Sequence, residues 1–269
     1  MKVLKKLRHD WILYLMLAPP LAYFVIFHVI PILGMRLAFQ DYRIIGDNVW
    51  VGTKHFEVLF SSPAFMNVLR NTVVISAMKM IFGFPVPIVL AILINEVTQR
   101  HFRKYVQSIV YLPHFLSWVV IAGIWIKLLS PSEGAVNLIA NFFGGPSIDY
   151  MTSKAHIRWV FVASEIWRSA GWDSIIYLAA IMSISPSLYE AARIDGATRL
   201  QSMIHITLPQ ITGTIVTVFI LNLGFFMSAG FDHVFNMMND SVISVADILD
   251  TYVYRSGIVN GQFAYSTAA

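Results

Sequence analysis

The chain has 269 residues, of which 57% are hydrophobic, 14% aromatic and only 13% charged, whereas soluble domains carry about 25% charged residues. This composition excludes a disordered protein and a nucleic-acid-coating protein, although the formal net charge is +4. The chain has no cysteine, which excludes disulfides, thiolate metal sites and a cysteine nucleophile. We therefore predict a protein embedded in a lipid bilayer, with no nucleic acid among its partners.

Five segments are long and apolar enough to cross a bilayer as helices, which takes about 20 residues. They cover residues 12–35, 72–95, 106–129, 157–184 and 211–231. Prolines interrupt the first three segments. A proline inside a span is tolerated where neighbouring helices or a water-lined cavity satisfy the freed carbonyl groups. We therefore predict an all-α polytopic bundle that forms one transmembrane domain with an internal cavity.

The positive charges predict the orientation of the chain. If residues 1–11 face the cytoplasm, so do residues 96–105 and 185–210, and these segments contain four, three and two basic residues. The alternate segments are together about twice as long and contain four, one and one. The positive-inside rule therefore predicts a cytoplasmic N-terminus, with the first apolar run an uncleaved span because it is too long for the core of a signal peptide.

The residues after the fifth predicted span lead to two further predictions. Asp232 and His233 follow it directly, and we expect them to form a solvated boundary at the outer surface, the alternative being the mouth where a delivering protein docks. An odd number of spans leaves the C-terminal segment outside, and the chain stops without a charged flank or a polar tail. We therefore expect a sixth span beyond Ala269.

The longest predicted cytoplasmic segment, residues 185–210, is expected to form two short helices. Pro186 and Ser187 are typical of a helix start, with Glu190 in the first turn, and Gly196 is typical of a helix end. A second amphipathic helix is predicted from Thr198 until Pro209 opens the last span. On pattern alone, such a segment is usually an interfacial amphipathic helix.

The particular residues of this segment indicate more than an interfacial helix. They resemble the EAA loop of permease subunits of bacterial binding-protein-dependent ABC importers in Glu190-Ala191-Ala192, Asp195-Gly196-Ala197, Ile206 and Leu208-Pro209. Motifs elsewhere resemble the oligosaccharide branch of the sugar-permease family, among them Phe39-Gln40-Asp41-Tyr42, Trp50-Val51-Gly52, Tyr111-Leu112-Pro113-His114-Phe115 and Asp250-Thr251-Tyr252-Val253-Tyr254-Arg255. That family has six-span cores, so the chain departs from its pattern in lacking the last span.

The resemblance implies a complex rather than a protein that acts alone. The expected partners are a second homologous permease, two ATPase subunits and an extracytoplasmic solute-binding protein that delivers a carbohydrate, in the cell membrane. The helix around Glu190 to Asp195 would be the coupling helix that sits in a groove of the ATPase. Small Ala191 and Ala192 allow close approach, and Gly196 allows a positive φ. ATP and Mg would be bound by the ATPase subunits, and no cofactor is expected in this chain.

Charged residues inside the predicted spans are candidates for the substrate pathway, because intramembrane charges are costly. In the fourth span, at about 100° per residue, one face carries Glu165, Arg168, Trp172 and Asp173. Such a face suits a sugar, but Glu165 and Arg168 also have the spacing of a pair that only neutralises itself. Lys79 in the second span is expected to pair with Glu165 or Asp173, or to line the same cavity. His28 and His114 have no second histidine or carboxylate at metal-ligand spacing beside them, so we expect both to be packed or hydrogen-bonded, and no metal site is predicted.

Two rival functions remain open at this point. The first is a permease of the same superfamily for a non-sugar solute, such as glycerol phosphate or a peptide. A strongly cationic cavity would favour the phosphate, whereas mixed charges with aromatic residues would favour a sugar. The second is a membrane enzyme or channel that works without ATP. The sequence has no phosphate-binding Gly-x-x-x-x-Gly-Lys-Ser/Thr motif, no Gly-x-Ser-x-Gly and no His-Glu-x-x-His, so we expect a protein that is not itself an enzyme.

Overall fold

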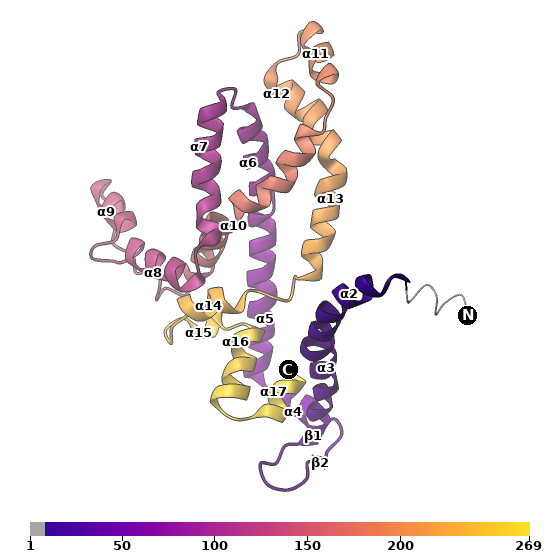
Figure 1. Ribbon diagram of the computed structural model, residues 1–269. Coiled ribbons are helices and arrows are strands. Elements are labelled where there is room, and N and C mark those ends of the chain that lie inside the picture. The colour runs from indigo at the N-terminus through magenta and orange to yellow at the C-terminus, as the bar shows by residue number, and fades with distance from the viewer. Residues whose placement is uncertain (1–8) are drawn as a thin grey trace. The chain divides into compact units, whose positions relative to one another are not determined.

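The computed structural model describes residues 9–269, and helices account for almost all of its regular structure (Figure 1). The chain divides into two compact units. One unit comprises the residues up to Pro63 together with Val253–Ala269, and the other comprises Ala64–Tyr252. The cavity and the loop that the sequence singles out both lie in the second unit.

The first unit begins with a helical segment, Trp11–Phe39, that is long and apolar enough to cross a membrane. It consists of α2 (Trp11–Phe24), η1 (Val25–Val29), α3 (Ile30–Gly34) and η2 (Met35–Phe39). The chain then forms a small antiparallel ladder of β1 (Gln40–Asp41) with β2 (Val49–Trp50), followed by α4 (Lys54–Ser61). The C-terminal elements η6 (Arg255–Val259) and α17 (Phe263–Ala268) complete the unit, and α17 packs against η2 and α4.

The second unit is built on long helices. The first, Pro63–Glu96, runs through α5 (Pro63–Met78), η3 (Lys79–Gly83) and α6 (Pro85–Glu96). The next elements are α7 (Arg100–Tyr111), η4 (Leu112–Phe115), α8 (Trp118–Leu128), α9 (Ala135–Phe142) and α10 (Ile157–Met182). After α11 (Pro186–Ile194), the helix Arg199–Gly224 runs through α12 (Arg199–Ser202), η5 (Met203–Thr207) and α13 (Leu208–Gly224). The short helices α14 (Phe231–Met237), α15 (Ile243–Ala246) and α16 (Leu249–Tyr254) follow.

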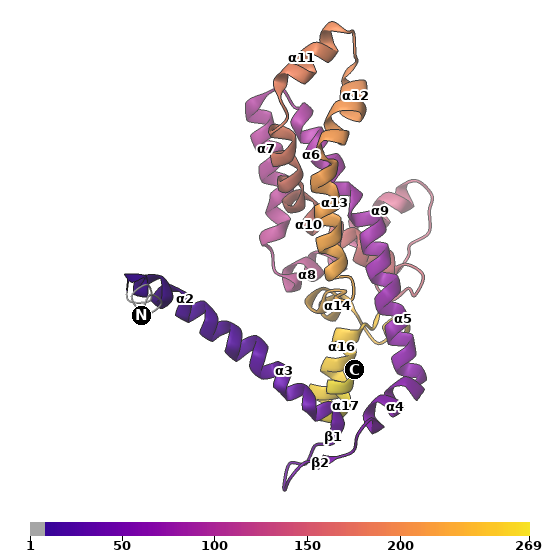
Figure 2. The same cartoon turned by 90° about the vertical axis from the view of Figure 1, so that its right-hand side faces the viewer.

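Helices α6, α7, α10 and α13 lie side by side, and α11 and α12 are at one end of this bundle (Figures 1 and 2). One buried apolar cluster joins α6, α10 and α13 through Ile88, Ala91, Ile94, Tyr177, Leu178, Ile181 and Ile211. A second cluster lies around Ile75, Phe161, Val234 and Ile248 and therefore joins α5 and α10 to the short helices after α13. The two clusters hold α10 along most of its length.

Helix α10 approaches α7 closely at Gly171. A Cβ atom placed on Gly171 would collide with the carbonyl oxygen of Val110 in α7. The φ of Gly171 is not in the left-handed region, so the backbone conformation does not require a glycine. The contact between the two helices requires it, because there is no room for a side chain. The close approach sets the distance between the two helices.

Prolines shape each of the three longest apolar helices in the same way. In each, a five-residue π-helical turn ends two residues before a proline: η1 precedes Pro31, η3 precedes Pro85 and η5 precedes Pro209. A proline lacks an N–H group, and its ring clashes with the carbonyl group of the preceding turn. Widening that turn accommodates both effects, so the helices continue through their prolines.

The structure confirms the predicted α-helical, membrane-spanning class and corrects several boundaries. Within residues 9–269, three helices are long and apolar enough to cross a membrane, or up to five if each of two bent helix pairs counts as one span. The predicted span 106–129 is a bent pair, with Arg100–Phe115 and Trp118–Leu128 at 106°. The break follows Pro113, and Ser117 starts the new helix by accepting a hydrogen bond from the Val120 N–H group.

The fifth predicted span is displaced towards the N-terminus. Its helix begins at Arg199 and ends at Gly224, so the predicted end at residue 231 is wrong. The amphipathic helix expected before Pro209 is the first part of this same helix, because the π-helical turn η5 lets the helix continue through Pro209. Gly230, with φ +93°, then turns the chain into α14.

Candidate functional site

A cavity of about 800 Å³ opens within the second unit, in the size range of small-molecule sites. Helices α5 to α6, α10 and α13 form its walls, and the turn after α13 and α14 also contribute to it. Its polar and aromatic lining residues include Ser76, Lys79, Trp118, Glu165, Ser169, Trp172, Asp173, Asn222 and His233. The cavity therefore combines charges of both signs with indole rings.

The predicted face of α10 points into this cavity. Glu165, Trp172 and Asp173 line it, and so does Lys79 from η3. The guanidinium carbon of Arg168 lies 4.8 Å from the centroid of the Trp118 ring, which lines the cavity. Four of the five predicted pathway residues thus line one space, whereas Arg168 is not among the lining residues. Contact of any of them with a substrate stays a prediction.

Glu165 pairs with Lys79 and does not pair with Arg168. One carboxylate oxygen, Oε2, lies 3.2 Å from Lys79 Nζ, and the other, Oε1, accepts a hydrogen bond from Ser169 Oγ at 3.0 Å. The Nε atom of Arg168 is buried, and within residues 9–269 no hydrogen-bond partner faces it. The prediction of a self-neutralising Glu165–Arg168 pair is therefore wrong. Of the alternatives left open for Lys79, the structure shows the pairing with Glu165 and a place in the cavity lining.

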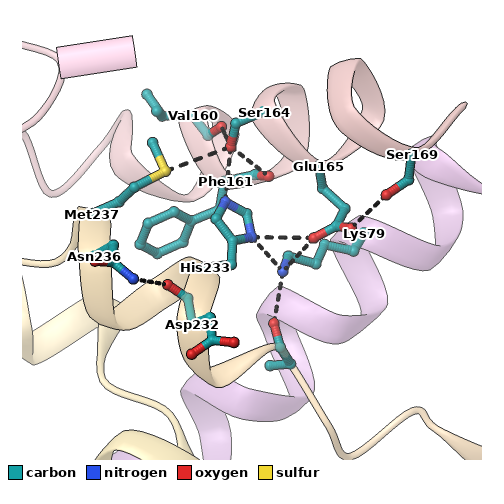
Figure 3. A network of polar contacts seen from close by, with 11 residues as sticks. Lys79, Val160, Phe161, Ser164, Glu165, Ser169, Asp232, His233, Asn236 and Met237 are labelled. Atoms are coloured by element: carbon teal, nitrogen blue, oxygen red, sulfur yellow. Dashed lines mark hydrogen bonds and ion pairs between the residues drawn. The ribbon is translucent and has the colours of Figure 1, made fainter. Parts of the chain in front are cut away.

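His233 is the third member of this network (Figure 3). Its Nδ1 atom lies 2.9 Å from Lys79 Nζ and 3.1 Å from Glu165 Oε2, and its Nε2 atom lies 2.8 Å from Ser164 Oγ. The ring stacks on Trp118 with 3.8 Å between centroids. His233 is fully buried, so the expectation that it forms a solvated boundary is wrong.

The position of His233 follows from the chain turning back after α13. Gly230 redirects the backbone, and α14 then places His233 against α10 and η3. In the sequence, nothing about a hydrophilic Asp-His pair after an apolar run indicates that the chain turns back and buries the histidine. The one available signal was Gly230, a residue that permits a sharp turn.

One side of the cavity is uncovered in the single chain. Trp172 and Phe225, which both line it, are 42% and 73% exposed. Leu221 and Ile176 are also exposed large apolar residues of this lining. Contiguous exposed apolar surface of this kind marks contact with lipid or with another protein.

The loop 185–210 forms a helix-turn-helix whose turn is determined locally. The N–H groups of Gly196 and Ala197 bond the carbonyls of Arg193 and Ala192, which is the Schellman pattern, and Gly196 has φ +80°. Thr198 and Gln201 then form a capping box that starts α12. Gly196 therefore caps the C-terminal end of α11, as the sequence predicts.

The predicted coupling residues lie on exposed parts of this loop. Glu190, Ala191, Asp195 and Gly196 are exposed, and Ala192 is half-buried. Glu190 lies in the second turn of α11, one turn later than expected. Leu208 and Pro209 are exposed at the start of α13, and a hydrogen bond of 2.9 Å between Tyr189 Oη and Thr207 Oγ1 holds α11 against this helix.

A depression of about 330 Å³ lies between the two helices of the loop. It is lined by Ala192, Asp195, Gly196, Ala197, Gln201, Ser202, His205 and Ile206. Beside it, Ile194 is 87% exposed and Leu200 is 64% exposed. Exposed apolar side chains around a polar depression are typical of a surface that another protein covers.

Comparison with known proteins identifies the class. Residues 83–231, more than half of the chain, match the family described as binding-protein-dependent transport system inner membrane component. The chain belongs to this family, and it is an inner-membrane permease component of a binding-protein-dependent ABC importer, with a role in transport rather than catalysis. The resemblance seen in the sequence is thereby confirmed.

Two relatives from Bacillus subtilis (strain 168) cover nearly the whole chain. The polygalacturonan/rhamnogalacturonan transport system permease protein YteP is 46% identical over 99% of this chain and 84% of its own length. Protein LplB is 40% identical over 97% of this chain and 83% of its own length.

A solved structure has the same fold. The crystal structure of a bacterial ABC transporter involved in the import of the acidic polysaccharide alginate is 41% identical, with a TM-score of 0.92, and the match covers 100% of this chain and 91% of that one. A second structure of the alginate transporter, in complex with an alginate pentasaccharide-bound periplasmic protein, gives the same identity and TM-score.

Proposed function

We propose that this permease imports an acidic oligosaccharide. Two relatives above 40% identity support the proposal, one from a polygalacturonan/rhamnogalacturonan system and the other from an alginate importer. Both substrates are polymers that contain sugar acids. The single observation that carries the proposal is that these matches extend over 99% and 100% of the chain and therefore include every residue that lines the cavity.

The lining of the cavity supports a sugar over a phosphate ester. Its charged residues, Lys79, Glu165 and Asp173, have mixed signs, and Trp118 and Trp172 offer ring faces to the apolar side of a sugar. Hydroxyl groups both donate and accept hydrogen bonds, so they suit a mixed set of partners. A relative named sn-glycerol-3-phosphate transport system permease protein UgpA, from Pectobacterium atrosepticum, is only 27% identical.

The working complex would contain a second permease, two ATPase subunits and a solute-binding protein. The exposed side of the cavity, with Trp172 and Phe225, supports a second permease that completes the pathway. The chain would lie in the membrane with its N-terminus and the loop 185–210 in the cytoplasm. ATP and Mg would be bound by the ATPase subunits.

Coupling to ATP hydrolysis would pass through α11. Its exposed residues, Glu190, Ala191 and Asp195 among them, would dock in a groove of the ATPase. The rigid turn at Gly196 and the Tyr189–Thr207 hydrogen bond would transmit the movement of the ATPase to α13. The binding protein would then release the sugar into the cavity.

The proposal is tested on the complex purified from its native membranes and reconstituted in lipid. ATP hydrolysis and uptake are measured with the co-purified binding protein and with trigalacturonate, trimannuronate or neutral trisaccharides. We expect hydrolysis and uptake to rise only with a sugar acid. A rise with neutral sugars alone would refute the acidic substrate, and purification of the chain without any ATPase would refute the coupling role.

A further inference from the structure

Lys79 is the best-positioned cation of the cavity. Its ammonium group donates to the Ala229 carbonyl oxygen at 2.6 Å and lies 2.9 Å from His233 Nδ1 and 3.2 Å from Glu165 Oε2. The side chain is 13% exposed and lines the cavity. An ammonium group with little access to water is costly unless an anion faces it. Within residues 9–269 its one carboxylate partner is Glu165.

The tautomer of His233 shows how Lys79 is held. Ser164 Oγ lies 2.7 Å from the Val160 carbonyl oxygen, which can only accept a hydrogen bond, so we assign the tautomer in which His233 Nε2 donates to Ser164 Oγ at 2.8 Å. Nδ1 of the neutral ring is then an acceptor for Lys79. Two uncharged acceptors, His233 Nδ1 and the Ala229 carbonyl, therefore hold the ammonium group in position beside Glu165.

Glu165 is held less firmly than Lys79. Besides Lys79, Oε2 faces the Nδ1 atom of His233 at 3.1 Å, and in the assigned tautomer this nitrogen carries no proton to donate. The other oxygen accepts one hydrogen bond, from Ser169. The side chain is 29% exposed and lines the cavity. A substrate carboxylate that enters the cavity can therefore displace Glu165 and bind the ammonium group of Lys79, which is already held in position.

We propose that Lys79 determines specificity for sugar acids by binding the substrate carboxylate, with Glu165 occupying that place when the cavity is empty. The step exchanges one carboxylate for another at Lys79 Nζ, and no proton or covalent bond is transferred. This inference rests on the proposed import of an acidic oligosaccharide. It assigns Glu165 the role of a competitor for Lys79 rather than of a ligand for the sugar.

The proposed roles of Lys79 and Glu165 predict opposite effects on the affinity for sugar acids when each residue is replaced. Lys79→Gln should lower the affinity for sugar acids about ten- to a hundredfold, the worth of a charge-assisted hydrogen bond. Glu165→Gln removes the resident anion and should raise that affinity about tenfold. Lys79→Arg should keep the preference for acids. A pair with a merely structural role would lose affinity in both glutamine variants.

The measurement is equilibrium binding by titration calorimetry to the purified complex without the binding protein. Trigalacturonate and trimannuronate are each compared with their carboxyl-reduced, neutral counterparts. Lys154→Gln and Glu133→Gln, which alter exposed residues outside the cavity, are the matched controls and should change nothing. The neutral counterparts should bind the wild type and both glutamine variants equally.

The outcomes separate this inference from the proposed function. If the wild-type complex binds neither sugar acid, both fail together. If it binds them but Glu165→Gln lowers the affinity, or Lys79→Gln leaves the preference for acids intact, only the role of Lys79 is refuted. Because Glu165→Gln predicts a gain, its result decides the matter even if Lys79→Gln does not assemble.

Discussion

At the scale of single residues, the loop 185–210 depends on a few positions with local requirements. Gly196 has φ +80° and closes the Schellman pattern, and the next residues form a capping box through Thr198 and Gln201. A side chain at this φ costs about 1–2 kcal/mol. The direction of α11 relative to α12 therefore depends on one glycine.

Gly196→Ala should reduce uptake several-fold while expression stays normal, because the strained turn shifts α11 away from its docking position. Uptake and ATP hydrolysis in reconstituted vesicles provide the measurement. Gly213→Ala is the control, since Gly213 lies inside α13 with open space around its Cβ position. Normal uptake by Gly196→Ala would show that the turn geometry is unimportant for coupling.

At the scale of elements, close packing between α7 and α10 holds the wall of the cavity. Gly171 lies one residue before Trp172 and faces the Val110 carbonyl of α7, while Trp172 stacks on His114 at the end of the same helical segment, with 4.5 Å between centroids. The neighbour of a cavity residue thus sets the distance between two helices. A change at Gly171 should therefore affect both the stability of the protein and the position of Trp172 in the cavity.

Gly171→Ala should destabilise the protein by about 1–3 kcal/mol, the usual cost of overpacking. The midpoint of thermal unfolding in detergent should fall, and binding of sugar should weaken because Trp172 moves with α10. Gly123→Ala serves as the control, because Gly123 has open space around its Cβ position within α8. An unchanged midpoint would contradict the close contact of the helices.

At the scale of the whole molecule, orientation in the membrane decides which partner meets which surface. The chain lacks cysteine, so single-cysteine variants report on one position each. The segment between α6 and α7 contains Gln99, and the segment between α8 and α9 contains Ser132, and both residues are exposed. The positive-inside rule places the two on opposite sides of the membrane.

Gln99→Cys should react with a membrane-impermeant maleimide only in inside-out vesicles, and Ser132→Cys only in intact cells. The unmodified chain, which lacks cysteine, should not react in either preparation. The reverse pattern would contradict a cytoplasmic N-terminus and would place the loop 185–210 outside, where no ATPase could reach it.

Local signals predicted much of this fold. The apolar segments, the bounds of α11 and the turn at Gly196 are encoded by neighbouring residues, because length, hydropathy and capping act over a few positions. The EAA-type motif likewise indicated the family to which the chain belongs. The errors lie where packing intervenes: the predicted span 106–129 is bent by 106° after Pro113, and the last long helix ends at Gly224 rather than at residue 231.

The sequence by itself therefore determined the membrane class, the family and the helical loop, since these depend on composition and on short-range spacing. Only the tertiary structure decided the partners of the buried charges. Glu165 pairs with Lys79, 86 positions away, although Arg168 stands three positions from it, and His233 joins them from α14. The physical reason is that apolar helix faces are nearly interchangeable in a sequence, whereas a buried charge has a partner only after particular helices have packed together.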